Sequence, residues 1–361
     1  MLSHIYLRVM GMNNYKVKII LCVIGIALFW TAFFMNPQLM IEKVNESLQL
    51  CIAVLIPTLF PFMVLSDFIV RSGLGGIVGS FFEPITRLLF RLPGNSACAV
   101  IMSAVGGYPV GAKMTAQLVE EGSLTAQQGK RMMLFCVNAG PAFVIGTVGT
   151  VMFSSRTAGM ILYFSMVISS FAMGVFTRIF AKETFSYKPK KITFETKVIS
   201  QSVMNGLQST LLLCAWVLLF SCVNSLTDII PLPESVRSWA KLITEVTGGC
   251  ITASDSFPVS IQALVMGWSG LSVHCQLLPY IKTAGLKYSH FMLSRVIHGA
   301  VSATVADVLF RIFPCETSVF STSAKVLPQM YSVSVPAAIF MMLLGAMLIT
   351  EMSQLGKKNN G

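Results

Sequence analysis

Charged residues are scarce in this chain, because Lys, Arg, Asp and Glu together make up only 11% of its 361 residues. Soluble globular domains average about 25% charged residues, so this sequence has too little charge for a water-soluble surface. Hydrophobic residues make up 54% of the chain instead. The composition excludes a soluble enzyme and a disordered protein, and it indicates a polytopic membrane protein whose outer surface faces lipid.

The sequence motifs of several function classes are missing as well. The nine cysteines include no CxxC pair, and most lie in apolar runs, where a free cysteine behaves as a small hydrophobe. The sequence has no P-loop, which argues against ATP-driven transport by this chain alone, and no HExxH motif. We therefore expect no disulfide framework, no metal site, no cofactor and no enzymatic activity.

Acidic residues are fewer than basic ones, which gives a net charge of +11. The basic residues cluster between apolar runs, as they do in loops that face an anionic cytoplasmic leaflet. The most basic loop, residues 182–200, follows Arg178 and is predicted to be cytoplasmic. Because basic–aromatic repeats and a soluble domain are both missing, we expect the lipid bilayer and a small solute as partners, and no nucleic acid. A homo-oligomer remains open.

Long apolar runs predict five membrane spans, at 17–35, 48–70, 157–180, 203–229 and 332–349. The first could also be read as a signal peptide, but it is long enough to span. The stretch 79–93 has charges at helical spacing among phenylalanines and leucines, which predicts an amphipathic helix in the interface. Two further runs, 130–153 and 289–313, carry polar residues and are predicted to be additional spans. In the second half, a polar loop at 231–241 leads into a second predicted amphipathic helix, which ends at residues 245–250.

Two stretches are too irregular to be simple spans. In the first, 95–121, short apolar arms flank the Gly/Pro-rich tip 106–111; in the second, 257–282, the centre 267–272 is rich in Gly and Ser. Irregular backbone at membrane depth persists only inside protein or beside a cavity. Both stretches therefore predict re-entrant helical hairpins.

The two halves of the chain share a spacing. Gly107 precedes Gly122 by fifteen residues and Gly270 precedes Gly285 by fifteen, each pair being followed by a polar helix. The predicted fold is an all-α polytopic membrane protein, an inverted-repeat transporter whose two hairpins open to opposite sides. The expected divisions are an N-terminal transmembrane helix (1–46), a first repeat (47–181), the cytoplasmic basic loop (182–200), a second repeat (201–351) and a polar tail (352–361). Each repeat is expected to contain a span, an interfacial helix, a hairpin and two further spans.

Four short motifs carry a family resemblance: PTLFPF at 57–62, GGYPVGAK at 106–113, NAGP at 138–141 and EVTGGC at 245–250. They resemble the YlbJ/SpoVV family of sporulation integral membrane proteins, which belongs with the nucleoside-recognition Gate-domain proteins. The resemblance implies a fold similar to concentrative nucleoside transporters and a role in endospore formation. It also implies movement of dipicolinate out of the mother cell, with the protein in the mother-cell membrane around the forespore.

The candidate site follows from the needs of an anionic solute at mid-membrane. Glycines at a hairpin tip let backbone N–H groups and the positive end of a helix dipole approach it, and basic side chains add charge-assisted hydrogen bonds. The predicted substrate-binding residues are Gly106, Gly107, Tyr108, Gly111, Lys113, Asn138, Arg295 and His298. Glu245 and Thr247 are predicted to act in coupling or gating, and Asp307 is predicted to pair with Arg311.

Structural explanations compete with each of these assignments. Glycines also serve close helix packing, Lys113 could pair with a structural acid, and a single His is commonly a structural hydrogen bonder. Three alternative functions stay open. They are a transporter of nucleosides or nucleobases, an intramembrane serine protease built on Ser269 and His298, and a membrane scaffold without transport activity.

Overall fold

The computed structural model describes residues 14–181 and 195–315. Within these ranges the chain is helical and contains no strand. Four helical stretches are long and apolar enough to cross a membrane: Pro37–Ser72, Arg156–Phe180, Thr196–Ile229 and Tyr288–Ile312. All four coincide with helices predicted from the sequence, while the predicted span at 332–349 and most of the basic loop lie outside the described residues.

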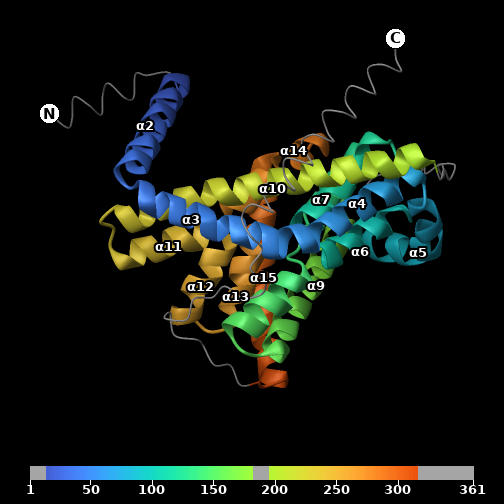
Figure 1. The fold of residues 1–361 in the computed structure, drawn as a ribbon. Helices are drawn as coiled ribbons and strands as arrows, with labels where there is room; N and C mark the ends of the chain where they lie inside the picture. The colour runs from blue at the N-terminus through green and yellow to red at the C-terminus, as the bar shows by residue number, and fades with distance from the viewer. Residues whose placement is uncertain (1–13, 182–194, 316–361) are drawn as a thin grey trace, which may run out of the picture.

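Two helix pairs form the frame of the molecule (Figure 1). In one, α4 (Ile56–Ser72) packs along α10 (Thr196–Ile229), and α4 continues α3 (Pro37–Leu50) through a π-helical turn, η1 (Cys51–Leu55). In the other, α9 (Arg156–Thr177), which ends in the short 3-10 turn η3 (Arg178–Phe180), packs along α15 (Tyr288–Ile312). The two pairs run in different directions, and the shorter helices lie between and beside them.

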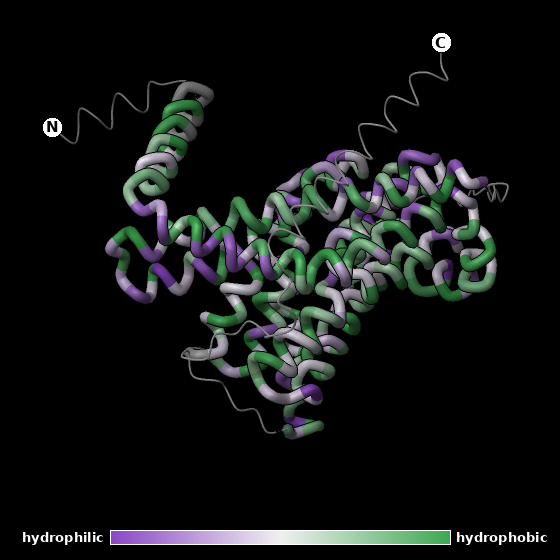
Figure 2. The backbone as a smooth tube through the Cα atoms, in the orientation of Figure 1, coloured by the Kyte–Doolittle hydropathy of each residue, from purple (hydrophilic) through white to green (hydrophobic). Residues whose placement is uncertain are grey.

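The N-terminal helix α2 (Asn14–Met35) stands apart from this frame. After Asn14, Lys16 and Lys18 at its start, its residues are mostly hydrophobic, whereas α3 carries several hydrophilic residues (Figure 2). Large apolar side chains such as Phe34 and Met35 are about three-quarters exposed, at 72% and 75%. A helix that is apolar all round and exposed needs lipid as its solvent, as predicted for the first span.

The first half of the chain contains a helical hairpin. After the amphipathic α5 (Gly75–Phe90), α6 (Ser96–Gly106) and α7 (Tyr108–Glu120) pack side by side and are joined by Gly107 alone. The chain continues in α8 (Ala126–Met133), loses helical structure over 134–141, and resumes as the π-helix η2 (Ala142–Met152). The predicted interruption at the NAGP motif is therefore present.

The second half also contains a hairpin, but not at the predicted place. The helices α11 (Glu234–Thr244) and α12 (Val246–Ser256) pack side by side and are joined by Glu245 alone. By contrast, α13 (Ile261–Trp268) and α14 (Gly270–Thr283) do not pack along each other, so the Gly/Ser-rich stretch is a broken helix. Ser269 and Gly270 adopt positive φ angles of 69° and 75° there. Such a break changes the direction of a helix without having to reverse it.

The order of elements is similar in the two halves. Within the described residues each half reads as long helix, hairpin, broken helix and long helix, so that α15 follows the same order as α9. The predicted division into repeats, with a second repeat that extends to residue 351, stays a prediction because residues 316–361 lie outside the described ranges. The four glycines of the predicted spacing, Gly107, Gly122, Gly270 and Gly285, all have positive φ. The spacing therefore marks real helix boundaries, although it equates a hairpin in one half with a broken helix in the other.

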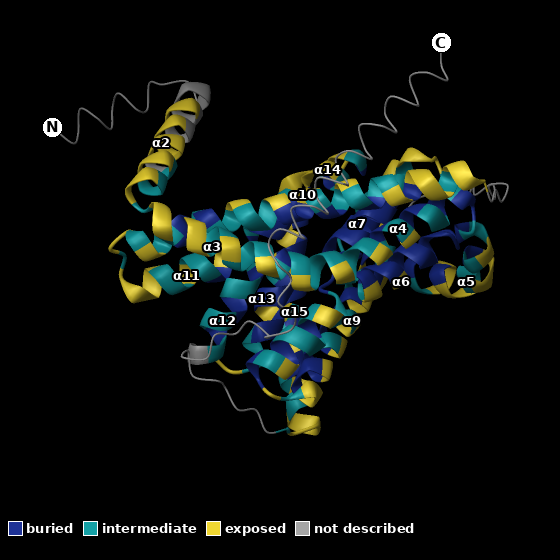
Figure 3. Cartoon of the chain, viewed as in Figure 1, coloured by how far each residue is buried: buried dark blue, intermediate teal, exposed yellow. Residues whose placement is uncertain are grey.

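The two hairpins open to opposite ends of the molecule. At one end, Arg178 Nη1 donates to the carbonyl of Leu88 at 2.5 Å, and Thr283 at the end of α14 reaches Glu120 at the end of α7 at 3.5 Å. We call this the basic end. At the other end, residues 258–260 after α12 lie beside Asp307 and Phe310 near the end of α15. The interior between the ends is closely packed, and α7 is its most buried helix (Figure 3).

Candidate functional site

A cavity of about 270 Å³ lies where four helix interruptions meet. The tip of each hairpin contributes to its wall, as do the break in the first broken helix and the first two turns of α14 that follow the break in the second. The rest of the wall comes from α3, η1, α4 and α10. The contributing residues are 105–109, 140–143, 245–247, Ser272, Val273 and Gln276, with Leu50, Val54, Leu55, all of the PTLFPF stretch except Phe60, Leu213 and Val217 completing the wall.

The tip of the first hairpin has a backbone that only glycine adopts readily. Gly107 has φ 86° and ψ 179°, a region that is costly for residues with a Cβ. It lies against the break of its own half, since a Cβ on Gly140 would come within 3.3 Å of Gly107 Cα. The neighbouring Tyr108 donates its hydroxyl to the carbonyl of Met266 at 2.6 Å, which ties this tip to the second half.

The tip of the second hairpin is built around Glu245. This residue is extended and caps α12, because its Oε2 accepts the backbone N–H of Gly248 at 2.6 Å. It too lies against the break of its own half, since a Cβ on Gly270 would come within 2.9 Å of Val246 N. The two halves therefore present equivalent junctions of hairpin tip and helix break to the same cavity.

Four helices begin at this cavity: α7 at Tyr108, η2 at Ala142, α12 at Val246 and α14 at Gly270. The first backbone N–H groups of a helix lack partners in the helix, and the aligned peptide dipoles add partial positive charge there. At α12 the Glu245 carboxylate already accepts the N–H of Gly248, so it is the other three ends, which have no side-chain cap, that make the backbone around the cavity favourable to an anion.

The charged side chains of the cavity wall do not add to this attraction for an anion. Among the described residues that line the cavity, Glu245 is the only Asp or Glu, and no Lys, Arg or His is present in the wall. The hydroxyl of Ser272 and the amide of Gln276 form no hydrogen bonds within the described chain and are available to a solute. Phe62, Phe143 and several prolines make the remaining wall apolar.

The cavity brings together five of the predicted site residues: Gly106, Gly107, Tyr108, Glu245 and Thr247. The other five, Gly111, Lys113, Asn138, Arg295 and His298, are buried outside its wall. Their predicted contact with substrate stays a prediction, and in this conformation each has contacts within the protein.

Arg295 stabilises the break in the first broken helix. It is fully buried on α15, and its two terminal nitrogens donate to the carbonyls of Val137 and Leu134, each at 2.5 Å. These carbonyls lie beyond the end of α8, where helical partners are missing. No carboxylate forms an ion pair with Arg295 within the described chain, and its Nε has no hydrogen-bond partner there.

The remaining predicted residues make local contacts. Asn138 donates its amide to the hydroxyls of Ser103 and Ser170 at 3.2 and 3.1 Å. His298 Nε2 lies 3.1 Å from the carbonyl of Met166. Gly111 packs so tightly against Ser103 that a Cβ would clash. The predicted pair of Asp307 and Arg311 is confirmed at 2.8 Å.

The Ser/His pair of the protease alternative is not assembled. Ser269 donates its hydroxyl to the carbonyl of Trp268 at 2.5 Å, whereas His298 faces Met166 from another helix. A nucleophile and its base need to lie within hydrogen-bond reach. Within the described residues no cluster of His, Cys, Asp and Glu could hold a metal ion, and the eight cysteines whose side chains are described are free.

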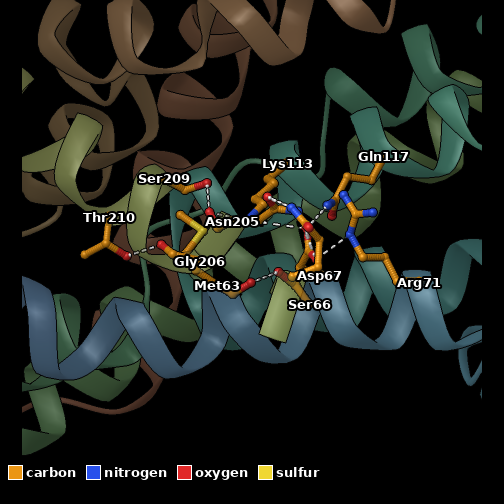
Figure 4. Close-up of polar contacts among 11 residues, drawn as sticks. Met63, Ser66, Asp67, Arg71, Lys113, Gln117, Asn205, Gly206, Ser209 and Thr210 are labelled. Carbon is orange, nitrogen blue, oxygen red and sulfur yellow. Dashed lines mark hydrogen bonds and ion pairs between the residues drawn. The ribbon is translucent and has the colours of Figure 1, made fainter. Parts of the chain in front are cut away.

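Lys113 belongs to a buried polar cluster that sequence analysis did not identify (Figure 4). Its partner is Asp67, a fully buried carboxylate on α4. Lys113 and Asp67 form an ion pair at 3.9 Å, and Arg71, Gln117 and Asn205 donate hydrogen bonds to Asp67. The available signal was a lone Asp inside an apolar run with an Arg four residues later, since an ionisable residue within a span is expected to have a partner and a role.

Comparison with known proteins agrees with a membrane role. Residues 52–183 match the Gate family, described as nucleoside recognition. The chain is 24% identical to the sporulation integral membrane protein YlbJ of Bacillus subtilis (strain 168), in a match covering 83% of this chain and 85% of that protein. No solved structure matches it. With its long apolar helices, the chain is an integral membrane protein.

Proposed function

Because the chain belongs to the YlbJ family of Gate-domain membrane proteins, we propose that it is a secondary transporter or facilitator of a small anionic aromatic solute. The observation that carries this proposal is the cavity at the meeting point of four helix N-termini. Backbone N–H groups can replace the hydration shell of an anion there, and the apolar wall suits a flat ring.

Dipicolinate is the first solute to test. It has two carboxylates on one aromatic ring, which suits N–H groups that approach from several directions and phenylalanine and proline side chains between them. The sporulation relative supports a role in endospore formation. The proposed location is accordingly the mother-cell membrane around the forespore, and the energy source is a solute or ion gradient.

Transport of this kind requires the cavity to open to one side at a time, and the two hairpins offer the means. We place the basic end in the cytoplasm, because basic residues are enriched in cytoplasmic loops. The α6–α7 hairpin then enters from the cytoplasmic side and the α11–α12 hairpin from the opposite side, as inverted-repeat transporters with interrupted helices require. This topology resembles that expected for concentrative nucleoside transporters.

A nucleoside or nucleobase is the second candidate, and the cavity wall favours it in one respect. Glu245, Ser272 and Gln276 offer hydrogen-bond acceptors and donors, and the wall contains no basic side chain. Such a set can bind the edge of a neutral base or sugar, while a carboxylate beside an anionic solute costs free energy.

Uptake into proteoliposomes distinguishes the two candidates. Purified protein is supplied with labelled dipicolinate or with a labelled nucleoside, and each is offered as an unlabelled competitor of the other. The proposal predicts saturable dipicolinate uptake that excess nucleoside does not inhibit. Nucleoside uptake alone would establish the second candidate, and uptake of neither solute with or without an ion gradient would contradict the transport proposal for both.

A further inference from the structure

The buried cluster around Asp67 joins the first hairpin to the α4–α10 pair. Asp67 Oδ2 accepts from Arg71 Nε at 2.7 Å, and the Asn205 amide lies 3.1 and 3.3 Å from the two carboxylate oxygens. The Gln117 amide donates to the same carboxylate. Lys113 Nζ lies 3.9 Å from Asp67 and donates to the carbonyl of Asn205 at 3.1 Å. Figure 4 shows these groups converging from three helices.

Lys113 is the least satisfied charged group in this cluster. Asp67 keeps three other donors if Lys113 is removed, including the guanidinium of Arg71. The ammonium has three N–H donors but one hydrogen bond within the described chain, and its side chain is 5% exposed. Burial of a charge with incomplete partners disfavours the charged form of a lysine.

The net charge of the cluster also indicates that Lys113 is the group that gives up its proton. With Lys113 protonated, the group of Asp67, Arg71 and Lys113 has a net charge of +1; with Lys113 neutral, the net charge is zero. The other ionisable side chain facing the cluster is Tyr280 of α14, near Ser209 and Asp67, while α10 contributes the uncharged Asn205 and Ser209. The proton on Lys113 is therefore the one that the cluster can lose while leaving a neutral, hydrogen-bonded pair.

We propose that Lys113 carries the coupling proton of transport. This inference rests on the proposed transport function and adds the driving ion to it. Lys113 lies on α7, the helix that begins with the cavity-lining residues Tyr108 and Pro109. Movement of α7 that accompanies solute release would separate Nζ from Asn205 and Asp67. The N–H bond then breaks, its electron pair stays on Nζ, and the proton passes to water on that side of the membrane.

Proton-driven accumulation tests this inference in proteoliposomes clamped at zero membrane potential. A gradient of one pH unit supports up to about tenfold accumulation if one proton moves with each solute. We expect wild type to accumulate the transported solute under such a gradient. For Lys113→Gln we expect the same solute uptake with the gradient as without it, a ratio of one. Lys282→Gln, an exposed lysine on α14, should accumulate as wild type does.

Two further measurements separate the possible failures. Solute exchange at equal pH shows whether Lys113→Gln is folded and moves solute. If this variant does not exchange solute, proton movement by wild type, followed with a pH-sensitive dye inside the vesicles, shows whether transport is coupled to protons. Solute uptake by wild type without proton movement, or gradient-driven accumulation by Lys113→Gln, overturns the role of Lys113 while leaving transport intact. Absence of any solute uptake overturns the proposed function instead.

Discussion

Replacement of Glu245 with Gln should change affinity in opposite directions for the two candidate solutes. Glu245 is the acidic side chain in the cavity wall, and its Oε2 accepts the N–H of Gly248. Gln keeps an oxygen for that contact and removes the charge. A solute carboxylate about 6 Å away, at an effective dielectric constant of about 20, is repelled by roughly 3 kcal/mol.

Water in the open cavity reduces this repulsion, so the expected gain for an anion is about 1–2 kcal/mol, or a KM roughly five- to thirtyfold lower. A nucleoside that donates a hydrogen bond to Glu245 would instead lose about 1.5–3 kcal/mol, and its KM would rise by at least tenfold. The assay is concentration-dependent uptake in proteoliposomes at equal pH on both sides.

The matched control is Glu234→Gln. Glu234 is an exposed acid in the first turn of α11, in the same hairpin but outside the cavity wall. Its replacement should leave KM for either solute within twofold of wild type. A rise in the dipicolinate KM on replacing Glu245 would refute the view that this carboxylate opposes an anion, and with it the charge argument for the cavity.

Two further predictions concern the elements that shape the cavity. Gly107→Ala should lower both the apparent melting temperature and solute uptake, because the backbone conformation of Gly107 costs a residue with a Cβ about 1–3 kcal/mol and because Gly140 lies close by. The control is Gly122→Ala, where φ is also positive but the space around the residue is open. This variant should lose only about 1–2 kcal/mol of stability and keep its uptake. Arg295→Met should destabilise the protein strongly in thermal unfolding, because two charged hydrogen bonds of about 1.5–3 kcal/mol each are lost. The control, Arg311→Gln, breaks an exposed ion pair and should cost only about 0–1 kcal/mol. Normal stability of Arg295→Met with selective loss of dipicolinate uptake would instead support direct contact with the solute.

Sequence periodicity was sufficient to locate the helices but not the path of the chain through them. Apolar runs and helix breakers identified the long helices, the hairpin at Gly107 and the break at NAGP, because these follow from local backbone chemistry. The direction of the chain after a break depends on tertiary packing. For this reason the sequence predicts an interfacial helix that ends at Glu245, where the structure has a hairpin tip without a glycine. It likewise predicts a hairpin tip at Gly270, where the structure has a helix break.

In the candidate site, too, local backbone features could be predicted from the sequence and tertiary contacts could not. The tip glycines and Glu245 could be predicted because their residue types fit backbone needs at a cavity. Whether a buried Arg or Lys faces a solute or the protein depends on which groups from distant segments surround it. Arg295 finds carbonyls about 160 positions away in sequence, and Lys113 finds Asn205 from α10. Neither contact leaves a pattern in the local sequence.

A steric block of the cavity tests the central claim most directly. Val217 lies in the cavity wall on α10, whereas Leu219 on the same helix is 45% exposed on the outer surface. Saturable solute uptake is measured for Val217→Trp and Leu219→Trp at equal amounts of reconstituted, folded protein. The account predicts that Val217→Trp abolishes uptake and Leu219→Trp preserves it. Wild-type uptake by Val217→Trp would show that the solute takes another route.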